Sequence, residues 1–208
     1  MNFIRNRNFR AGPQTSLEGF ICPQNSDKQQ KIKVFGRSAG GELCEDYLRW
    51  KSYQKRSFLT LVLLSPAFRM LCYYRMRKHS RLLKLLLKPL RLRNSILFYL
   101  NAEEIGGGLF IEHGFSTIVS CRHIGKNCYI NQQVTVGFSD AIHSPYIGDN
   151  VHIKAGAKVI GGITIGDDVI IGAGAVVVKD IPSHSIVVGV PAKVIKRRNN
   201  INENWTTV

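Results

Sequence analysis

The sequence predicts a mainly β fold, a parallel solenoid of short strands, preceded by a small α-helical region. The main observation is a six-residue period that begins at Ile105 and has an aliphatic residue at every first position. Glycine directly follows six of these twelve positions. Inward-pointing aliphatics at this spacing are typical of short strands bent at regular corners, in which each rung buries its aliphatics over the next. The twelve first positions are Ile105, Ile111, Ile118, Ile124, Ile130, Val136, Ile147, Ile153, Val159, Ile165, Ile171 and Val177.

The 208 residues divide into four predicted parts. Residues 1–44 have neither a helical nor a strand period and are expected to form a poorly ordered tail. A basic helical region follows over 45–104, then the solenoid domain over 105–182, then a C-terminal loop and tail over 183–208. In the helical region Ser65 and Pro66 predict the start of a second helix, because serine can cap a first helical turn and the first helical position tolerates proline. The leucine-rich stretch 80–88 predicts a third helix, which Pro89 ends.

Positive charge is concentrated in the N-terminal half. The chain has 29 Lys and Arg against 14 Asp and Glu, a net charge of +15. Nine basic residues and no acidic one lie between Arg69 and Arg93. One interpretation is contact with an anionic surface, either a membrane leaflet or nucleic acid. The other is a helical packing domain with a solvated basic face. No nucleic-acid-binding motif accompanies the charge, so nucleic acid is the less expected partner.

Cysteine usage and apolar runs bear on the compartment. The five cysteines are an odd number without C-x-x-C spacing, and we expect them to be reduced thiols. The most apolar stretch before the repeats, 58–64, is far shorter than a membrane span, and no apolar run follows the arginines of the first ten residues. We therefore expect a cytoplasmic protein, with peripheral contact at the inner membrane face left open by the basic helices.

The six-residue period is broken twice, and each break contains a histidine. Seven residues separate Ile111 from Ile118, and this interval contains His113. Eleven residues separate Val136 from Ile147, and this interval contains His143. Extra residues in a solenoid must leave the coil, and loops that protrude from a rigid scaffold often contain binding and catalytic groups.

Several ordered segments accompany the repeats. They are 133–137 (QVTVG), 147–151 (IGDNV), 156–163 (GAKVIGGI), 171–177 (IGAGAVV) and 189–195 (GVPAKVI). Together, over about 60–197, the chain resembles the hexapeptide-repeat acyltransferases, most closely serine acetyltransferases and their polysaccharide-locus relatives. The resemblance implies a left-handed parallel β-helix with three hexads per turn, here about four turns. It also implies a homotrimer with acyl-CoA sites between neighbouring prisms.

His113 is the candidate catalytic base. A hydroxyl is a poor nucleophile while protonated, and a neutral imidazole can accept its proton near pH 7. The segment 105–114 (IGGGLFIEHG) is similar to the family segment whose histidine takes the proton of the acceptor hydroxyl, with Glu112 where the family usually has aspartate. The alternative is a histidine that only fills a corner.

Two departures from the family pattern concern the same site. The family has a carboxylate fifteen residues before the base, which orients the imidazole, whereas this chain has 98–101 (FYLN) there. Glu112 or a backbone carbonyl would then have to fix the tautomer. The family also places an arginine beside a histidine to hold the serine carboxylate, whereas this chain has 142–145 (IHSP) without an arginine. His143 is either an acceptor-binding residue or a surface loop residue.

The resemblance places the acyl donor, acetyl-CoA, along the later coils. Small residues there would let its pantetheine arm lie against the backbone, and lysines would lie near its phosphates. Small residues are also what a tight corner requires, which is the simpler explanation for each one alone. The candidates are Ala155, Gly156, Ala173, Gly174, Lys179 and Lys193. No metal is expected, because 153–160 contains no histidine at the spacing of the zinc-holding β-helix enzymes.

The resemblance therefore implies an acetyl-CoA-dependent O-acetyltransferase of serine acetyltransferase type, acting on L-serine in cysteine biosynthesis. The missing arginine favours a second hypothesis, a sugar O-acetyltransferase of surface-polysaccharide assembly. The missing orienting acid leaves a third, a non-catalytic trimeric scaffold.

Overall fold

A computed structural model describes residues 39–76, 85 and 98–208. The predicted tail up to residue 38, and all of 80–88 except Leu85, lie outside the described residues. Within the described residues, the helices before the strands are, in chain order, α2 (Ala39–Gln54), α3 (Phe58–Leu64) and α4 (Pro66–Met76). The strands are β1 (Phe98–Ile105), β2 (Phe110–Ile111), β3 (Thr117–Ile124), β4 (Tyr129–Ile130), β5 (Thr135–Gly137), β6 (Tyr146–Ile147), β7 (His152–Ile153), β8 (Lys158–Ile160), β9 (Thr164–Ile165), β10 (Ile170–Ile171), β11 (Val176–Val177), β12 (Ser185–Val188), β13 (Lys193–Arg197) and β14 (Thr206–Thr207).

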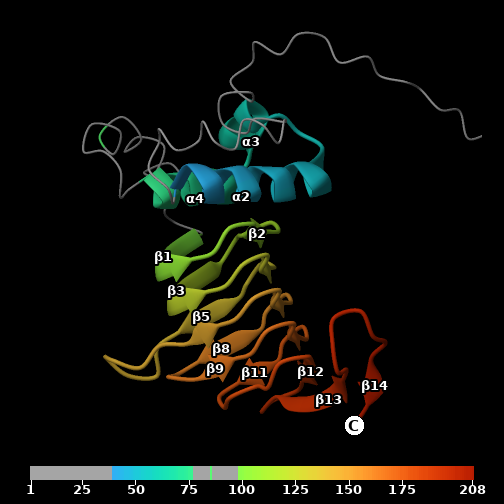
Figure 1. Ribbon diagram of the computed structural model, residues 1–208. Coiled ribbons are helices and arrows are strands. Elements are labelled where there is room, and N and C mark those ends of the chain that lie inside the picture. Colours follow the sequence, from blue (N-terminus) through green and yellow to red (C-terminus); the bar gives the residue numbers. More distant parts are fainter. Residues whose placement is uncertain (1–38, 77–84, 86–97) are drawn as a thin grey trace, which may run out of the picture.

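The strands form a parallel solenoid, which confirms the predicted fold class (Figure 1). One face stacks β2, β4, β7, β10 and β12. The long strand β3 pairs with β5 through its first half and with β6 through its second half, so β1 and β3 run through the bend between the other two faces. The solenoid has about five turns, one more than the sequence predicts, because β1 adds strand before Ile105 and β12 continues the stack beyond 182.

The register confirms three hexads per turn. Val159 pairs with Val177 and Ile147 with Ile165, each 18 residues further along the chain. Val136, however, pairs with Val159, 23 residues on, because five extra residues leave the coil between them. The prediction was wrong at one position: Val119, not Ile118, occupies the inward place, since Val119 is fully buried and Ile118 is 49% exposed.

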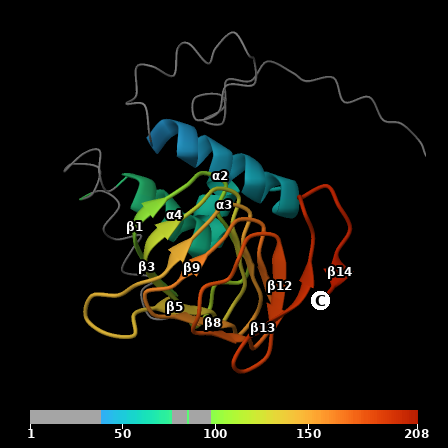
Figure 2. The same ribbon diagram turned by 60° about the horizontal axis from the view of Figure 1, so that its bottom comes forward.

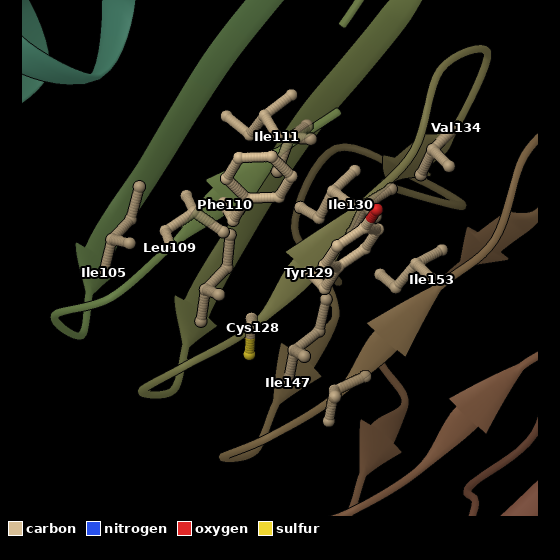
Figure 3. Packing of buried hydrophobic residues seen from close by; sticks show 14 of the residues in the cluster. Ile105, Leu109, Phe110, Ile111, Cys128, Tyr129, Ile130, Val134, Ile147 and Ile153 are labelled. Atoms are coloured by element: carbon tan, nitrogen blue, oxygen red, sulfur yellow. The ribbon is translucent and has the colours of Figure 1, made fainter. Parts of the chain in front are cut away.

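Burial of the inward aliphatics holds the coils together. Figure 3 shows Ile111, Ile130 and Ile153 lying in line on successive coils, and all three are almost fully buried. Each fully buried aliphatic side chain contributes about 1.5–3 kcal/mol relative to an exposed one. The solenoid is therefore stabilised mainly along its length, rung against rung.

The helices close the N-terminal end of this core. In Figure 2 the C-terminal end of the solenoid comes forward, and α2 lies across the opposite end. Trp50 of α2 is fully buried, and its indole nitrogen donates to the carbonyl of Leu109, 2.9 Å away. Helix α2 begins at Ala39, six residues before the predicted start. Ser65 caps α4 as predicted, because its hydroxyl accepts from the amide of Phe68 at 3.3 Å.

A buried ion pair joins the helices to the first coil. Arg75 of α4 donates from Nε to Asp46 of α2 at 2.8 Å and from Nη2 to the carbonyl of Gly106 at 2.7 Å. Asp46 in turn accepts from the amide of Leu109 at 2.9 Å. Burial raises the pKa of Asp46, and the guanidinium of Arg75 opposes that rise. Removing one partner of such a pair leaves an uncompensated buried charge, which typically costs about 3–5 kcal/mol.

The C-terminal residues close the opposite end. Strand β13 pairs antiparallel with β12 and with β14 (Figure 1). Arg198 donates from Nε to Asp168 at 2.7 Å and lies over the ring of Trp205, 4.1 Å from its centroid. Burial opposes the ionisation of Asp168, but Arg198 and His184 hold its pKa below the ordinary value.

Among the four described cysteines, one differs from the prediction. Cys44 is disulfide-bonded, so the expectation of five reduced thiols is wrong there. Cys72, Cys121 and Cys128 are free, and burial raises the pKa of all three thiols. Across the part of the chain that the structure describes, no helix has both the length and the apolar character needed to cross a bilayer.

The register is tested by two isoleucines on β3. Ile124 is fully buried, whereas Ile118 is 49% exposed. We expect Ile124→Ala to lower the free energy of unfolding by about 2–5 kcal/mol, because it leaves a cavity between coils. Ile118→Ala, the matched control, should change it by less than about 1 kcal/mol. Urea unfolding followed by circular dichroism gives both values, and equal losses would contradict the register.

Candidate functional site

Each turn of the solenoid has three corners, so the corners of successive turns form three edges. The first edge consists of 112–116, 131–134, 154–157 and 172–175. The second edge includes the long loop 138–145 and the corner 161–163. The third edge consists of 106–109, 125–128, 148–151 and 166–169.

His113 lies at the top corner of the first edge. The extra residues of this corner give it a left-handed backbone, with φ of 64° at His113 and 57° at Gly114. A Cβ atom on Gly114 would lie 3.1 Å from the Cβ of Ala67, so glycine lets the corner pack under α4. The His113 side chain is exposed. Among the described residues no group forms a hydrogen bond with its imidazole, and Phe98 is an apolar neighbour of the corner.

Glu112 is held by two residues of the next coil. The hydroxyl of Tyr129 donates to Glu112 Oε2, and Asn131 Nδ2 donates to the same oxygen at 2.7 Å. Burial and the bond to Glu112 raise the pKa of Tyr129. The carboxylate is therefore fixed to the next coil, and the described residues show no bond from it to the imidazole of His113.

Tyr129 is itself fixed by a stack of rings on the outer face. It stacks on His152 of the next coil at 5.3 Å between centroids, and Phe110 lies above it at 5.2 Å. The amine of Lys154 lies 4.9 Å from the Tyr129 centroid. Burial, followed by the charges of Lys154 and Arg49, lowers the pKa of His152 to about 4. His152 is therefore neutral near pH 7 and acts as a packing residue.

His143 lies on the second edge, in the long loop that projects from the solenoid in Figure 1. Its Nδ1 lies 2.7 Å from Asp140 Oδ2, and its backbone amide donates to Asp140 Oδ1 at 2.7 Å. These bonds, with one from the amide of Ile142, lower the pKa of Asp140 to about 2. The ring packs over Gly162, where a Cβ would lie 2.9 Å from the Cβ of His143. The imidazole is thus oriented, with Nδ1 on the carboxylate.

Four of the six candidate donor residues lie together on the first edge, below His113. Ala155 and Gly156 lie in one corner, and Ala173 and Gly174 lie in the corner beneath it. A hydrogen bond of 2.9 Å from the Gly174 amide to the Ala155 carbonyl joins the two corners. A Cβ on Gly174 would meet nothing within 4 Å, so this corner faces open space. The remaining two candidates, Lys179 and Lys193, are exposed on later segments.

A hollow between the first coils and α2 lies on the third edge, away from His113 and His143. It measures about 340 Å³ and is lined by carboxylates, the amine of Lys126 and glycine backbone. Three of its carboxylates have partners: Glu42 pairs with Arg75, Glu104 with His123, and Asp149 accepts from the amide of Lys126. We assign it no catalytic part. Within 39–76, Leu85 and 98–208, no three His, Cys, Asp or Glu side chains are arranged to hold a metal ion.

Sequence reasoning missed Tyr129, Asn131 and Asp140. Asp140 had a local signal, since an aspartate three residues before His143 can accept from the amides that follow it. Tyr129 and Asn131 had none, because their closeness to Glu112 depends on the register of the next coil.

The comparisons with known proteins agree with this architecture. Residues 144–179 match the family model "Bacterial transferase hexapeptide (six repeats)". A serine acetyltransferase of Staphylococcus xylosus is 43% identical over 99 residues, which is 45% of this chain and 45% of that protein. The chain thus matches less than half the length of this curated relative.

Solved structures are similar over more of the chain. Serine acetyltransferase from Brucella abortus strain S19 has a TM-score of 0.65 at 26% identity, covering 88% of this chain and 85% of that one. The Neisseria gonorrhoeae serine acetyltransferase in complex with serine has a TM-score of 0.60 at 28% identity, covering 79% and 72%.

Fold and repeats together define a β-solenoid built from six-residue repeats, of which 144–179 match the hexapeptide model. The chain is similar to serine acetyltransferases in sequence over 45% of its length and in fold, so the resemblance inferred from its sequence is confirmed.

The buried neutral state of His152 predicts a pH dependence of stability. Its folded-state pKa of about 4 lies below the ordinary 6.5, so the unfolded chain takes up this proton first as the pH falls. Stability should therefore decrease as the pH falls from about 6.5 toward 4. Unfolding free energies near pH 7 and pH 5 should differ less in His152→Gln than in the wild type. The control His123→Gln should behave as wild type, and an unchanged dependence in His152→Gln would refute the assignment.

Proposed function

We propose that this protein is an acetyl-CoA-dependent O-acetyltransferase of serine acetyltransferase type, which transfers acetyl to the hydroxyl of L-serine. The observation that carries the proposal is the first edge, where His113 lies above a line of small-residue corners. The similarity to serine acetyltransferases, including one solved with serine, supports the reaction class and the acceptor. A place in cysteine biosynthesis belongs to the same proposal.

In the proposed reaction acetyl passes directly from CoA to the acceptor, with one proton acceptor and no covalent enzyme intermediate. His113 accepts the proton of the acceptor hydroxyl while its oxygen attacks the thioester carbonyl carbon. The carbon–sulfur bond breaks, and the imidazolium returns the proton to the leaving thiolate, which yields the ester and free CoA. Glu112, which is held by Tyr129 and Asn131 and precedes His113 in the chain, would supply negative charge that favours the imidazolium.

Acetyl-CoA would lie along the lower corners of the first edge. Ala155, Gly156, Ala173 and Gly174 present little side chain, so an extended pantetheine arm can approach the backbone amides. Lys179 and Lys193 supply charge for the phosphates.

A trimer would bring the two histidines into one site. In a single chain His113 lies on the first edge and His143 on the second. Two chains packed side by side, first edge to second edge, would place His143 of one subunit near His113 of its neighbour. The exposed apolar side chain of Phe115, within the first edge itself, supports a subunit contact there.

The long loop 138–145 on the second edge favours another candidate acceptor, a sugar. Asp140 places a negative charge beside His143, and residues 137–146 contain neither lysine nor arginine. An acceptor with its own carboxylate would be repelled there, whereas a sugar hydroxyl would not. A sugar O-acetyltransferase is therefore the alternative function.

His113→Ala should lower acetyl transfer by at least about a hundredfold, because the acceptor loses its general base. The measurement is release of CoA thiol from acetyl-CoA by the full chain, with L-serine and then with a panel of sugars and nucleotide sugars. His123→Ala, a histidine on another face that stacks on Tyr146, is the matched control and should keep wild-type turnover.

Turnover with serine that His113→Ala removes would support the proposal, and turnover with a sugar alone would select the alternative acceptor. Undiminished turnover in His113→Ala would overturn the assigned base. A folded protein that neither turns over nor binds CoA would favour a trimeric scaffold.

A further inference from the structure

Helix α3 exposes an apolar ridge to solvent. Leu59 and Leu63 are each 58% exposed and Leu64 is 63% exposed, whereas Phe58 and Leu61 pack inward. The helix therefore has an apolar side toward the core and a second apolar side toward the outside. We call Leu59, Leu63 and Leu64 the α3 ridge. A surface helix usually presents polar residues to water, so this ridge is a candidate contact surface.

The α3 ridge lies at the N-terminal end of the molecule, beyond the helices that cover the first coil. Figure 1 shows α3 on the side of α2 and α4 that faces away from the strands. None of the three leucines is among the residues assigned to acetyl transfer, and the inference does not depend on that function.

Basic residues flank the α3 ridge at both ends. Lys55 and Arg56 are exposed just before the helix cap at Ser57. Arg69 donates from Nη1 to the carbonyl of Leu63 at 3.2 Å, at the other end of the helix. Residues 47–76 contain six basic and no acidic residues. Like charges would oppose contact between two copies of this surface, and the same charges attract an anionic one.

We propose that the α3 ridge docks the protein on an anionic phospholipid membrane. The three leucines would enter the boundary between headgroups and acyl chains, while Lys55, Arg56 and Arg69 would lie at the level of the lipid phosphates. Apolar residues and positive charge on one surface are the pair of signals that reversible membrane binding needs. A nucleic acid would use the charge but offers no apolar layer for exposed leucines.

Vesicle flotation with the full chain tests the proposal. Mixed phosphatidylcholine–phosphatidylglycerol vesicles should bind the protein, and pure phosphatidylcholine vesicles should bind it much less. Leu63→Ser should lower the partition coefficient at least about tenfold, because one inserted leucine is lost. Lys55→Gln should lower it about fivefold on anionic vesicles, and raised salt should weaken binding by the wild type. Ile201→Ser, at an apolar residue that is 48% exposed near the C-terminus, is the matched control and should bind as wild type.

Circular dichroism and thermal unfolding of each variant establish that it is folded. Equal binding by wild type and Leu63→Ser, or no preference for anionic vesicles, would overturn the proposal. The proposal would also fail if light scattering showed that the wild type self-associates, that Leu63→Ser does not, and that both bind vesicles equally. The α3 ridge would then join two copies of the chain. Binding to nucleic acid that Lys55→Gln weakens and Leu63→Ser leaves unchanged, with no flotation, would assign the charge to nucleic acid instead.

Discussion

The stacking of one inward aliphatic on the next is the constraint on which the rest of the structure depends. Val159 lies under Val136 and over Val177, and a shift of one residue would turn these side chains toward solvent. A turn of fixed length follows, so additional residues are expelled from the coil. The corner with His113 and the loop with His143 are the two places where this happens. The rigid scaffold thus decides where the reactive side chains lie.

The ends of the stack need a different solution, because an open rung would expose its aliphatics to water. At the N-terminal end the helices cover the first coil. Asp46 and Arg75 pair with each other, and each also forms a hydrogen bond with the backbone of that coil. The same packing fixes α3 outside the capping helices. The location of the apolar ridge is therefore a consequence of how the solenoid is closed, and the strands β13 and β14 close the other end.

Much of this could be predicted from sequence because a six-residue period reports burial directly. The solenoid, its two interruptions and the cap at Ser65 follow from local patterns. Ile118 was placed inward because an interval of seven looks like one extra residue, whereas the inward positions Ile111 and Val119 are eight residues apart and Val119 and Ile124 only five. The partners of Glu112 could not be predicted, since they lie on another coil and depend on register. Strand β1 was missed because it precedes the first regular repeat.

In this protein the coil supplies the scaffold, and the residues that leave the coil at the His113 corner and the His143 loop supply the chemistry. Deleting 139–143 tests this claim most directly, because this deletion restores an 18-residue turn and removes His143. The account predicts that the deleted protein keeps its circular dichroism spectrum, its unfolding free energy and its affinity for CoA, while acetyl transfer to the acceptor is lost. A protein that no longer folds, or one that transfers acetyl at the wild-type rate, would contradict it.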